Sequence, residues 1–308
     1  MPERGGIPLG QRYRSNTMTV ETRWSGLTVT DWLDTPDTET TPDGPAIVSA
    51  DSILVRVLTG RGRAHLEFAP RPEFGQVAVQ LQPLDDGLLV LGSNEPVALY
   101  SPGVTWEVTS DGVYETAKAV VDLSTAGGPV VLEMRFGTHS LEHHRLPIHE
   151  RQAAAEQPWK DWVSTLRLPN TGRDLVARSA LTLRGLCHQP SGSILAAATT
   201  SLPEELGGVR NWDYRYCWLR DAALTARALV DLGSTGEAEA LLRWIDGVVE
   251  RTGGHPERLH PLYTVDGYEL GAEAVIDTLP GYAGSRPSGS GTSPTTSSNS
   301  MSSVRSPT

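Results

Sequence analysis

Apolar and polar residues alternate along roughly the first 135 positions of the chain, and this alternation dominates the N-terminal half. It is clearest in five short segments: 52–58, 77–82, 87–91, 105–109 and 130–136. A period of two predicts strands, and clusters of Asp, Gly, Ser and Pro between the segments predict turns. No helical crossover separates the strands, so an antiparallel β-sandwich is expected. Residues 26–50, rich in Thr, Asp and Pro, are expected to form an irregular loop.

The pattern changes after residues 141–157, which are charged and rich in His, because apolar residues then recur every three or four positions. This period of about 3.6 predicts amphipathic helices. Three helices are expected, over 175–187, 221–232 and 234–252. Their expected inward faces are, in order, Leu175, Val176, Ala180, Leu183 and Cys187; Leu224, Ala228, Leu229 and Leu232; and Leu241, Leu242, Ile245, Val248 and Val249.

The ends of these helices carry recognisable signals. Gly233 stands where a left-handed cap would end the second helix, and 234–237 (Ser-Thr-Gly-Glu) fits a capping box for the third. Successive helices with short connections predict an all-α bundle or toroid, of which only the opening part fits before residue 287. Residues 288–308, almost entirely Ser, Thr, Pro and Gly, cannot bury a core and are expected to be a disordered tail.

Composition narrows the class of partner. The chain has 308 residues, 38% hydrophobic, and a net charge of −11, which argues against nucleic acid and an anionic membrane as partners. Neither a signal peptide nor an apolar run of membrane-spanning length occurs, so a cytoplasmic location is expected. Cys187 and Cys217 are expected to be buried free thiols. The His-rich stretch 139–150 lacks metal-ligand spacing and is interpreted as a solvated linker. Oligomeric state stays open.

The densest chemical segment is 210–221 (RNWDYRYCWLRD), which interleaves four aromatic residues with charges directly ahead of a helix. A pyranose ring offers apolar C–H faces for stacking and hydroxyls for planar charged groups. Arg220 and Asp221 could hold such hydroxyls. Equally, Asp221 could merely cap a helix that begins at Ala222, with Arg220 as its ion-pair partner. Glu204 and Glu205 are expected to be structural rather than catalytic, since adjacent side chains usually point apart.

A family resemblance separates these alternatives. Residues 197–205 (AATTSLPEE) followed by 210–223, together with 279–287 (LPGYAGSRP) and 12–31, resemble bacterial members of glycoside hydrolase family 15, the glucoamylase and trehalase relatives. The resemblance covers roughly residues 11–287. It implies hydrolysis of terminal glucose from α-glucosides with inversion, without a cofactor or metal. It further implies that Arg220 and Asp221 grip that glucose, with Trp218 and Tyr214 in the same subsite.

The resemblance also implies a domain layout. Residues 1–140 would form a trehalase-like β-sandwich that is incomplete at its N-terminus, 141–172 a linker, and 173–287 the first helices of an (α/α)6 toroid. In the family, the catalytic glutamates follow the position of Pro287, so this chain is expected to be truncated and inactive. Codons for 288–308, read one base earlier, could encode the family's continuing sequence, which suggests a frameshifted product.

Two alternatives to an inactive hydrolase stay open. One is a non-catalytic carbohydrate-binding remnant, and the other is a chain without function that is degraded. The sequence does not separate trehalose from maltose or longer α-glucans as the sugar.

Overall fold

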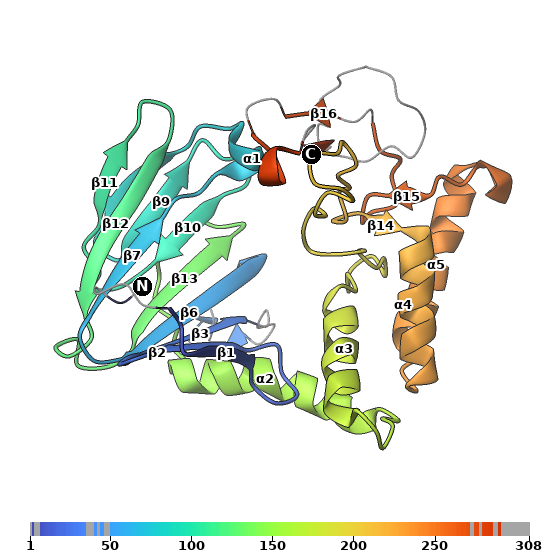
Figure 1. Ribbon diagram of the computed structural model, residues 1–308. Helices are drawn as coiled ribbons and strands as arrows, with labels where there is room; N and C mark the ends of the chain where they lie inside the picture. The colour runs from blue at the N-terminus through green and yellow to red at the C-terminus, as the bar shows by residue number, and fades with distance from the viewer. Residues whose placement is uncertain are drawn as a thin grey trace. The chain divides into compact units, whose positions relative to one another are not determined.

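The chain folds into two compact units, Met1–Trp162 and Val163–Thr308. The structure is a computed structural model that describes residues 2, 7–34, 40–41, 44–45, 50–271, 274–276, 279–285 and 289–290 (Figure 1). The division falls inside the range 141–172, which the sequence assigns to a linker. Of the tail 288–308, on which the predictions of disorder and of a frameshift rest, the structure describes only residues 289–290, which form a short strand paired with 274–275. The rest of the tail lies outside the described residues.

The first unit is built from antiparallel strands. Its elements are β1 (Gly10–Tyr13), β2 (Val20–Trp24), β3 (Leu27–Leu33), β4 (Thr40–Thr41), β5 (Gly44–Pro45), β6 (Ser52–Gly60), β7 (Arg63–Phe68), the short helix α1 (Pro72–Gly75), β8 (Gln80–Leu84), β9 (Gly87–Leu91), β10 (Val97–Tyr100), β11 (Glu107–Ser110), β12 (Glu115–Asp122), β13 (Val130–Phe136) and α2 (Ile148–Thr165). Eight strands form one sheet in the order β1-β2-β3-β6-β13-β10-β9-β8, and β11-β12-β7 form a second. The predicted antiparallel β architecture is thereby confirmed.

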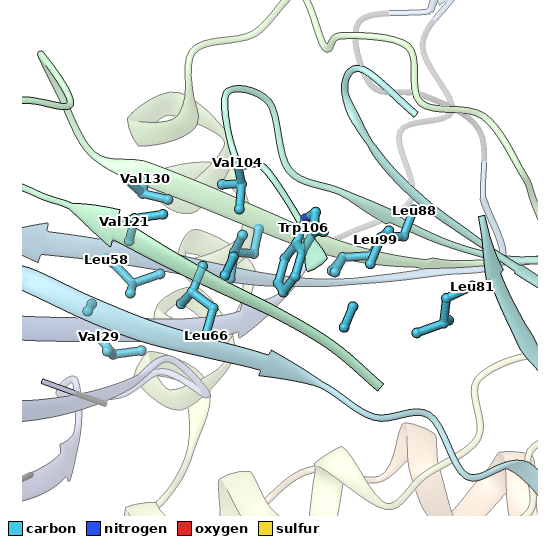
Figure 2. Packing of buried hydrophobic residues seen from close by; sticks show 14 of the residues in the cluster. Val29, Leu58, Leu66, Leu81, Leu88, Leu99, Val104, Trp106, Val121 and Val130 are labelled. Atoms are coloured by element: carbon cyan, nitrogen blue, oxygen red, sulfur yellow. The ribbon is translucent and has the colours of Figure 1, made fainter. Parts of the chain in front are cut away.

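The core of this unit lies between the two sheets (Figure 2). Leu58 and Leu88 enter it from the eight-stranded sheet, and Leu66 and Val121 enter from the three-stranded sheet. Trp106 is 9% exposed beside them and donates its indole N–H to a serine hydroxyl, so its polar atom is satisfied. Removal of this apolar surface from water is the main force that holds the sheets together.

One segment expected to be a loop is a strand at the centre of the large sheet. Within 26–50, β3 pairs with β2 on one side and β6 on the other. Leu27 and Val29 face the core between the sheets, whereas Trp32 faces the opposite side. The Thr and Asp residues between them hid this strand, because both of its faces are covered and simple alternation breaks down. The rest of 35–49, apart from β4 and β5, lies outside the described residues.

Strand β6 is also buried on both faces. Ile53, Val55 and Val57 share a face, as their spacing predicts, and this face packs with Trp32 and with Ala155 of α2. Leu58 points to the core between the sheets instead. Helix α2 therefore covers the side of the large sheet that the small sheet leaves open.

A buried ion cluster, made of Asp34, Glu133, Arg135, His144 and Arg151, fixes α2 to this sheet. Arg135 Nη2 lies 2.8 Å from a Glu133 carboxylate oxygen, and His144 Nε2 lies 2.6 Å from the same oxygen. Arg151, from α2, donates to the other Glu133 oxygen at 2.5 Å and also to Asp34. The side chains of Arg151 and His144 are only 3% exposed, so the interpretation of 139–150 as a solvated linker is wrong at His144. Burial forces these charges to pair.

The second unit is helical, with short strand pairs at its loops. Its elements are α3 (Arg173–Gly185), β14 (Cys217–Trp218), α4 (Leu219–Asp231), α5 (Gly236–Arg251), the 3-10 turn η1 (Pro256–Arg258), β15 (Leu262–Tyr263), β16 (Ala274–Val275), the turn η2 (Tyr282–Gly284) and β17 (Gly289–Ser290). Its core joins Ala222 and Ala226 of α4 to Leu241 and Trp244 of α5 and to Tyr263. None of the described helices has both the length and the apolar character needed to cross a bilayer.

The three predicted helices form, and Ala180, Leu229, Leu241 and Val248 are buried as predicted, but each helix exposes one leucine that was expected to face inward. Leu175, Leu224 and Leu242 were expected to be buried, yet they are 76%, 65% and 61% exposed. Small residues such as Ala222 and Ala226 take the inward positions on α4, where they allow close approach to α5. Periodicity finds an apolar stripe but does not say which neighbour will cover it.

The start of α5 also departs from the predicted capping box. Thr235, rather than Ser234, precedes the first helical residue, and its side chain makes no capping hydrogen bond. Ser234 instead donates its hydroxyl to the Glu237 carboxylate at 2.6 Å. The two predicted partners therefore meet side chain to side chain.

Candidate functional site

The aromatic segment is held in an extended form by the chain that precedes it. Ala197 donates its backbone N–H to the carbonyl of Tyr214 at 2.8 Å, and Ser201 donates to the carbonyl of Trp212 at 2.7 Å. The backbone carbonyls of Trp212 and Tyr214 therefore both point toward residues 197–201, as the carbonyls of alternate residues in an extended chain do. The side chain of Asp213, between them, is 1% exposed and points inward.

Asp213 organises the segment from the inside. Its carboxylate accepts two hydrogen bonds from the Arg215 guanidinium, at 2.9 and 2.7 Å. Its backbone carbonyl accepts the indole N–H of Trp218 at 2.9 Å. Because a buried carboxylate is costly unless it is paired, this arrangement fixes the local backbone and the Trp218 ring together.

Three aromatic rings, all half-buried, form a contiguous row. Trp212 and Trp218 are 6.1 Å apart between ring centroids at 81°, and Tyr214 and Trp218 are 5.9 Å apart at 88°. Such edge-to-face contacts are favourable for aromatic pairs and leave ring surface available. Of these residues, Tyr214 and Trp218 were predicted from the sequence as site residues, and Trp212 was not.

Arg220 and Asp221 lie in the first turn of α4, directly after Trp218. The Arg220 side chain is 80% exposed, and its guanidinium lies 3.5 Å from the Asp221 carboxylate, whose side chain is 36% exposed. Asp221 is not the cap of a helix that begins at Ala222, because α4 begins at Leu219 with Trp218 as its N-cap residue. An acidic side chain in the first turn is favoured by the partial positive charge of the helix N-terminus.

Two long-range contacts hold this helix start. Strand β14 pairs with β15, which sets Cys217 opposite Tyr263 and Trp218 opposite Leu262. The backbone N–H of Leu219 then donates to the carbonyl of Pro261 at 2.9 Å. The position of Trp218 is therefore set by the chain that follows α5.

Glu204 contacts the aromatic row. Glu204 accepts the Trp212 indole N–H at 2.8 Å and the Arg210 guanidinium at 3.2 Å. These hydrogen bonds hold the pKa of Glu204 below its usual value, so its carboxylate is ionised at neutral pH. A general acid needs a raised pKa, so this environment agrees with a structural role for Glu204.

The other titratable candidates do not form a second reactive centre among the described residues. Cys217 is buried and Cys187 half-buried, both as free thiols. Burial raises the pKa of Cys217 to about 11 and that of Cys187 to about 12, which keeps both protonated and poorly nucleophilic. Within the described residues, no three His, Cys, Asp or Glu side chains gather as a metal site would require.

Comparison with known proteins defines the class. Residues 170–293, which carry the aromatic row and the Arg220–Asp221 pair, match the family model of Glycosyl hydrolases family 15. Residues 1–159 match the model described as Trehalase-like, N-terminal. The chain therefore belongs to the family described as Trehalase-like, N-terminal, and its second part carries a Glycosyl hydrolases family 15 domain, as the resemblance of its motifs implies.

Curated relatives agree with the family. The chain is 28% identical to a trehalase of Mycolicibacterium smegmatis over 301 residues, which is 91% of this chain and 45% of the relative. It is 36% identical to Trehalase 1 of Sulfolobus acidocaldarius over 206 residues, 66% of this chain and 34% of the relative. A trehalase of Mycobacterium tuberculosis is 41% identical over 133 residues, 42% of this chain and 19% of the relative. The matches span less than half the length of each relative.

Proposed function

We propose that this chain binds the terminal glucose of an α-glucoside, with trehalose as the preferred sugar, through Arg220, Asp221, Trp218 and Tyr214. The observation that carries the proposal is the exposed Arg220–Asp221 pair at the start of α4, directly after a row of half-buried aromatic rings. The relatives named trehalase support trehalose as the sugar.

The proposed roles follow from the chemistry of each group. The Trp218 and Tyr214 rings offer apolar surface for the C–H face of a pyranose. The Arg220 guanidinium donates to sugar oxygens in a fixed plane, and the Asp221 carboxylate accepts from two neighbouring hydroxyls. A neutral sugar needs no excess of positive charge, which suits a chain with a net charge of −11. No cofactor takes part in these contacts.

At the level of the whole protein, we infer an inverting hydrolase acting on trehalose or α-glucans. Helices α3 to α5 would then open an (α/α)6 toroid over residues 173–287. Inversion needs two carboxyls about 6.5–9.5 Å apart, one to protonate the leaving oxygen and one to activate water. The resemblance places both of these carboxyls beyond the position of Pro287.

Calorimetric titration with trehalose, maltose and soluble starch tests the proposal, with Asp221→Ala as the key variant. Asp231→Ala is the matched control, since Asp231 lies on the same helix and pairs with exposed Arg227 at 3.0 Å. Loss of a charge-assisted hydrogen bond predicts at least about tenfold weaker binding for Asp221→Ala. The control should bind like the unaltered chain. Equal binding by all three proteins would refute the proposed site.

Glucose release measured on the same samples tests the inference about hydrolysis. Turnover by the 308-residue chain that Asp221→Ala abolishes would show that it holds its own catalytic carboxyls. Binding without turnover supports a sugar-recognition role. A higher affinity for maltose or starch than for trehalose would reassign the preferred sugar.

A further inference from the structure

Trp212 is the member of the aromatic row that the proposed glucose site does not use. Its ring is half-buried, and its centroid lies 6.1 Å from that of Trp218, which also contacts Tyr214. A large aromatic side chain with open surface beside a sugar site is well placed to contact a second sugar ring. We infer that Trp212, oriented by Glu204, contacts the second sugar ring of a disaccharide; this inference rests on the proposed function.

The spacing of the segment supports a second ring rather than the first. Trp212 and Tyr214 lie two positions apart in an extended stretch, with buried Asp213 between them, so their side chains leave the same side. Alternate residues of an extended chain are about 6.5 Å apart, a distance comparable with the length of one sugar unit. If Tyr214 meets the terminal glucose, Trp212 meets the unit next to it.

Both N–H groups of Trp212 donate hydrogen bonds, which fix the orientation of the ring in the absence of a ligand. Its backbone N–H donates to the Ser201 hydroxyl at 2.8 Å, and its indole N–H donates to Glu204 at 2.8 Å. Glu204 is held in turn by the Arg210 guanidinium, and its backbone N–H donates to the Arg210 carbonyl at 3.1 Å. A ring that is already ordered loses less entropy on binding. Glu204 is thus a positioning residue.

The loop that carries Glu204 is anchored at a distant point of the chain. The backbone N–H of Gly207 donates to the hydroxyl of Ser285 at 2.8 Å, and Ser285 is fully buried. Ser285 belongs to the segment 279–287, the second motif that the family resemblance identified. This contact gives the motif a role in the helical unit: it holds the loop that orients Trp212.

The test compares a monosaccharide with a disaccharide. Trp212→Ala should weaken trehalose binding about fivefold to tenfold, whereas glucose affinity should change by less than about twofold. Glu204→Ala should produce a smaller loss in the same direction, about threefold, and Glu204→Gln should restore affinity because its amide oxygen still accepts the indole N–H. Glu205→Ala is the matched control, an adjacent carboxylate without this contact, and should leave both affinities unchanged.

A nuclear magnetic resonance titration adds a signature that a merely structural role would not produce. The indole N–H signal of Trp212, assigned by its absence in Trp212→Phe, should shift with trehalose and stay in place with glucose. Equal losses for glucose and trehalose in Trp212→Ala, or no loss for either, would overturn the inference while the Asp221 result still decides the proposed function. A chain that binds neither sugar would refute both.

Discussion

Replacing Arg151 by Met removes one guanidinium from the buried ion cluster while it keeps an apolar stem of similar length. The Arg151 side chain is 3% exposed and pairs with Glu133 and Asp34, so both carboxylates lose a charged partner. Glu133 keeps Arg135 and His144, and Asp34 keeps the indole N–H of Trp32 at 2.8 Å. The variant therefore leaves two buried carboxylates with fewer charged hydrogen-bond donors.

The expected loss of unfolding free energy is about 3 kcal/mol, the lower end of the range for breaking a buried ion pair, because Glu133 stays partly compensated. The titration of Glu133 gives a similar scale. Burial alone would raise the pKa of Glu133, but the His144 hydrogen bond and the charge of Arg151 outweigh burial and hold it at about 2, against 4.5 when unperturbed. That difference corresponds to about 3 kcal/mol, the net of what all partners supply and what burial costs.

Urea unfolding of the full chain, followed by tryptophan fluorescence and near-ultraviolet circular dichroism, measures this loss. Arg56→Met is the matched control. Arg56 pairs with Asp31 at 2.7 Å on the same sheet, but its side chain is 54% exposed, so its removal should cost less than about 1 kcal/mol. Equal unfolding midpoints for the two variants would refute the idea that the cluster fixes α2 through buried charge.

Acid should weaken the β unit in a defined window. The folded-state pKa of Glu133 lies below its unfolded value, so the contribution of Glu133 to stability is complete above about pH 4.5 and is lost as the pH falls toward 2. Glu133→Gln should flatten this pH dependence of the unfolding free energy. An unchanged slope in the variant would contradict the prediction. The thiols of Cys217 and Cys187 should react slowly with a disulfide reagent at pH 7.5, because their raised pKa values leave almost no thiolate. Both should react promptly in urea, and rapid labelling of the folded chain would contradict the burial described.

Local pattern located strands in which apolar residues recur with a period of two. The segments 87–91 and 130–136 coincide with β9 and β13. The pattern missed β3, where Thr and Asp interrupt the apolar residues, and it did not predict that Leu224 of α4 is exposed. In each case, the partner that decides burial comes from a distant part of the chain, which a window of residues does not contain.

The candidate site also combines residues that the sequence motif brings together with a contact that the sequence did not predict. Trp218, Arg220 and Asp221 are almost consecutive in the chain, so the motif itself places them at one helix start. The contact between Trp212 and Glu204 crosses a loop whose course no spacing rule fixes. The sequence did offer one signal for Trp212, its position two residues before the predicted site residue Tyr214. This spacing places both side chains on one side once the segment is known to be extended.

The pairing of β14 with β15 has a consequence for the order of folding. Cys217 and Trp218 precede α4, whereas their partners Leu262 and Tyr263 follow α5, so this short ladder joins positions that are separated in the chain by both helices. Contacts between distant positions carry a loop-closure cost that local helix contacts avoid. The proposed sugar-binding surface is therefore expected to assemble late, after the two helices. A nascent or partly unfolded chain would show helical content before it could recognise a sugar.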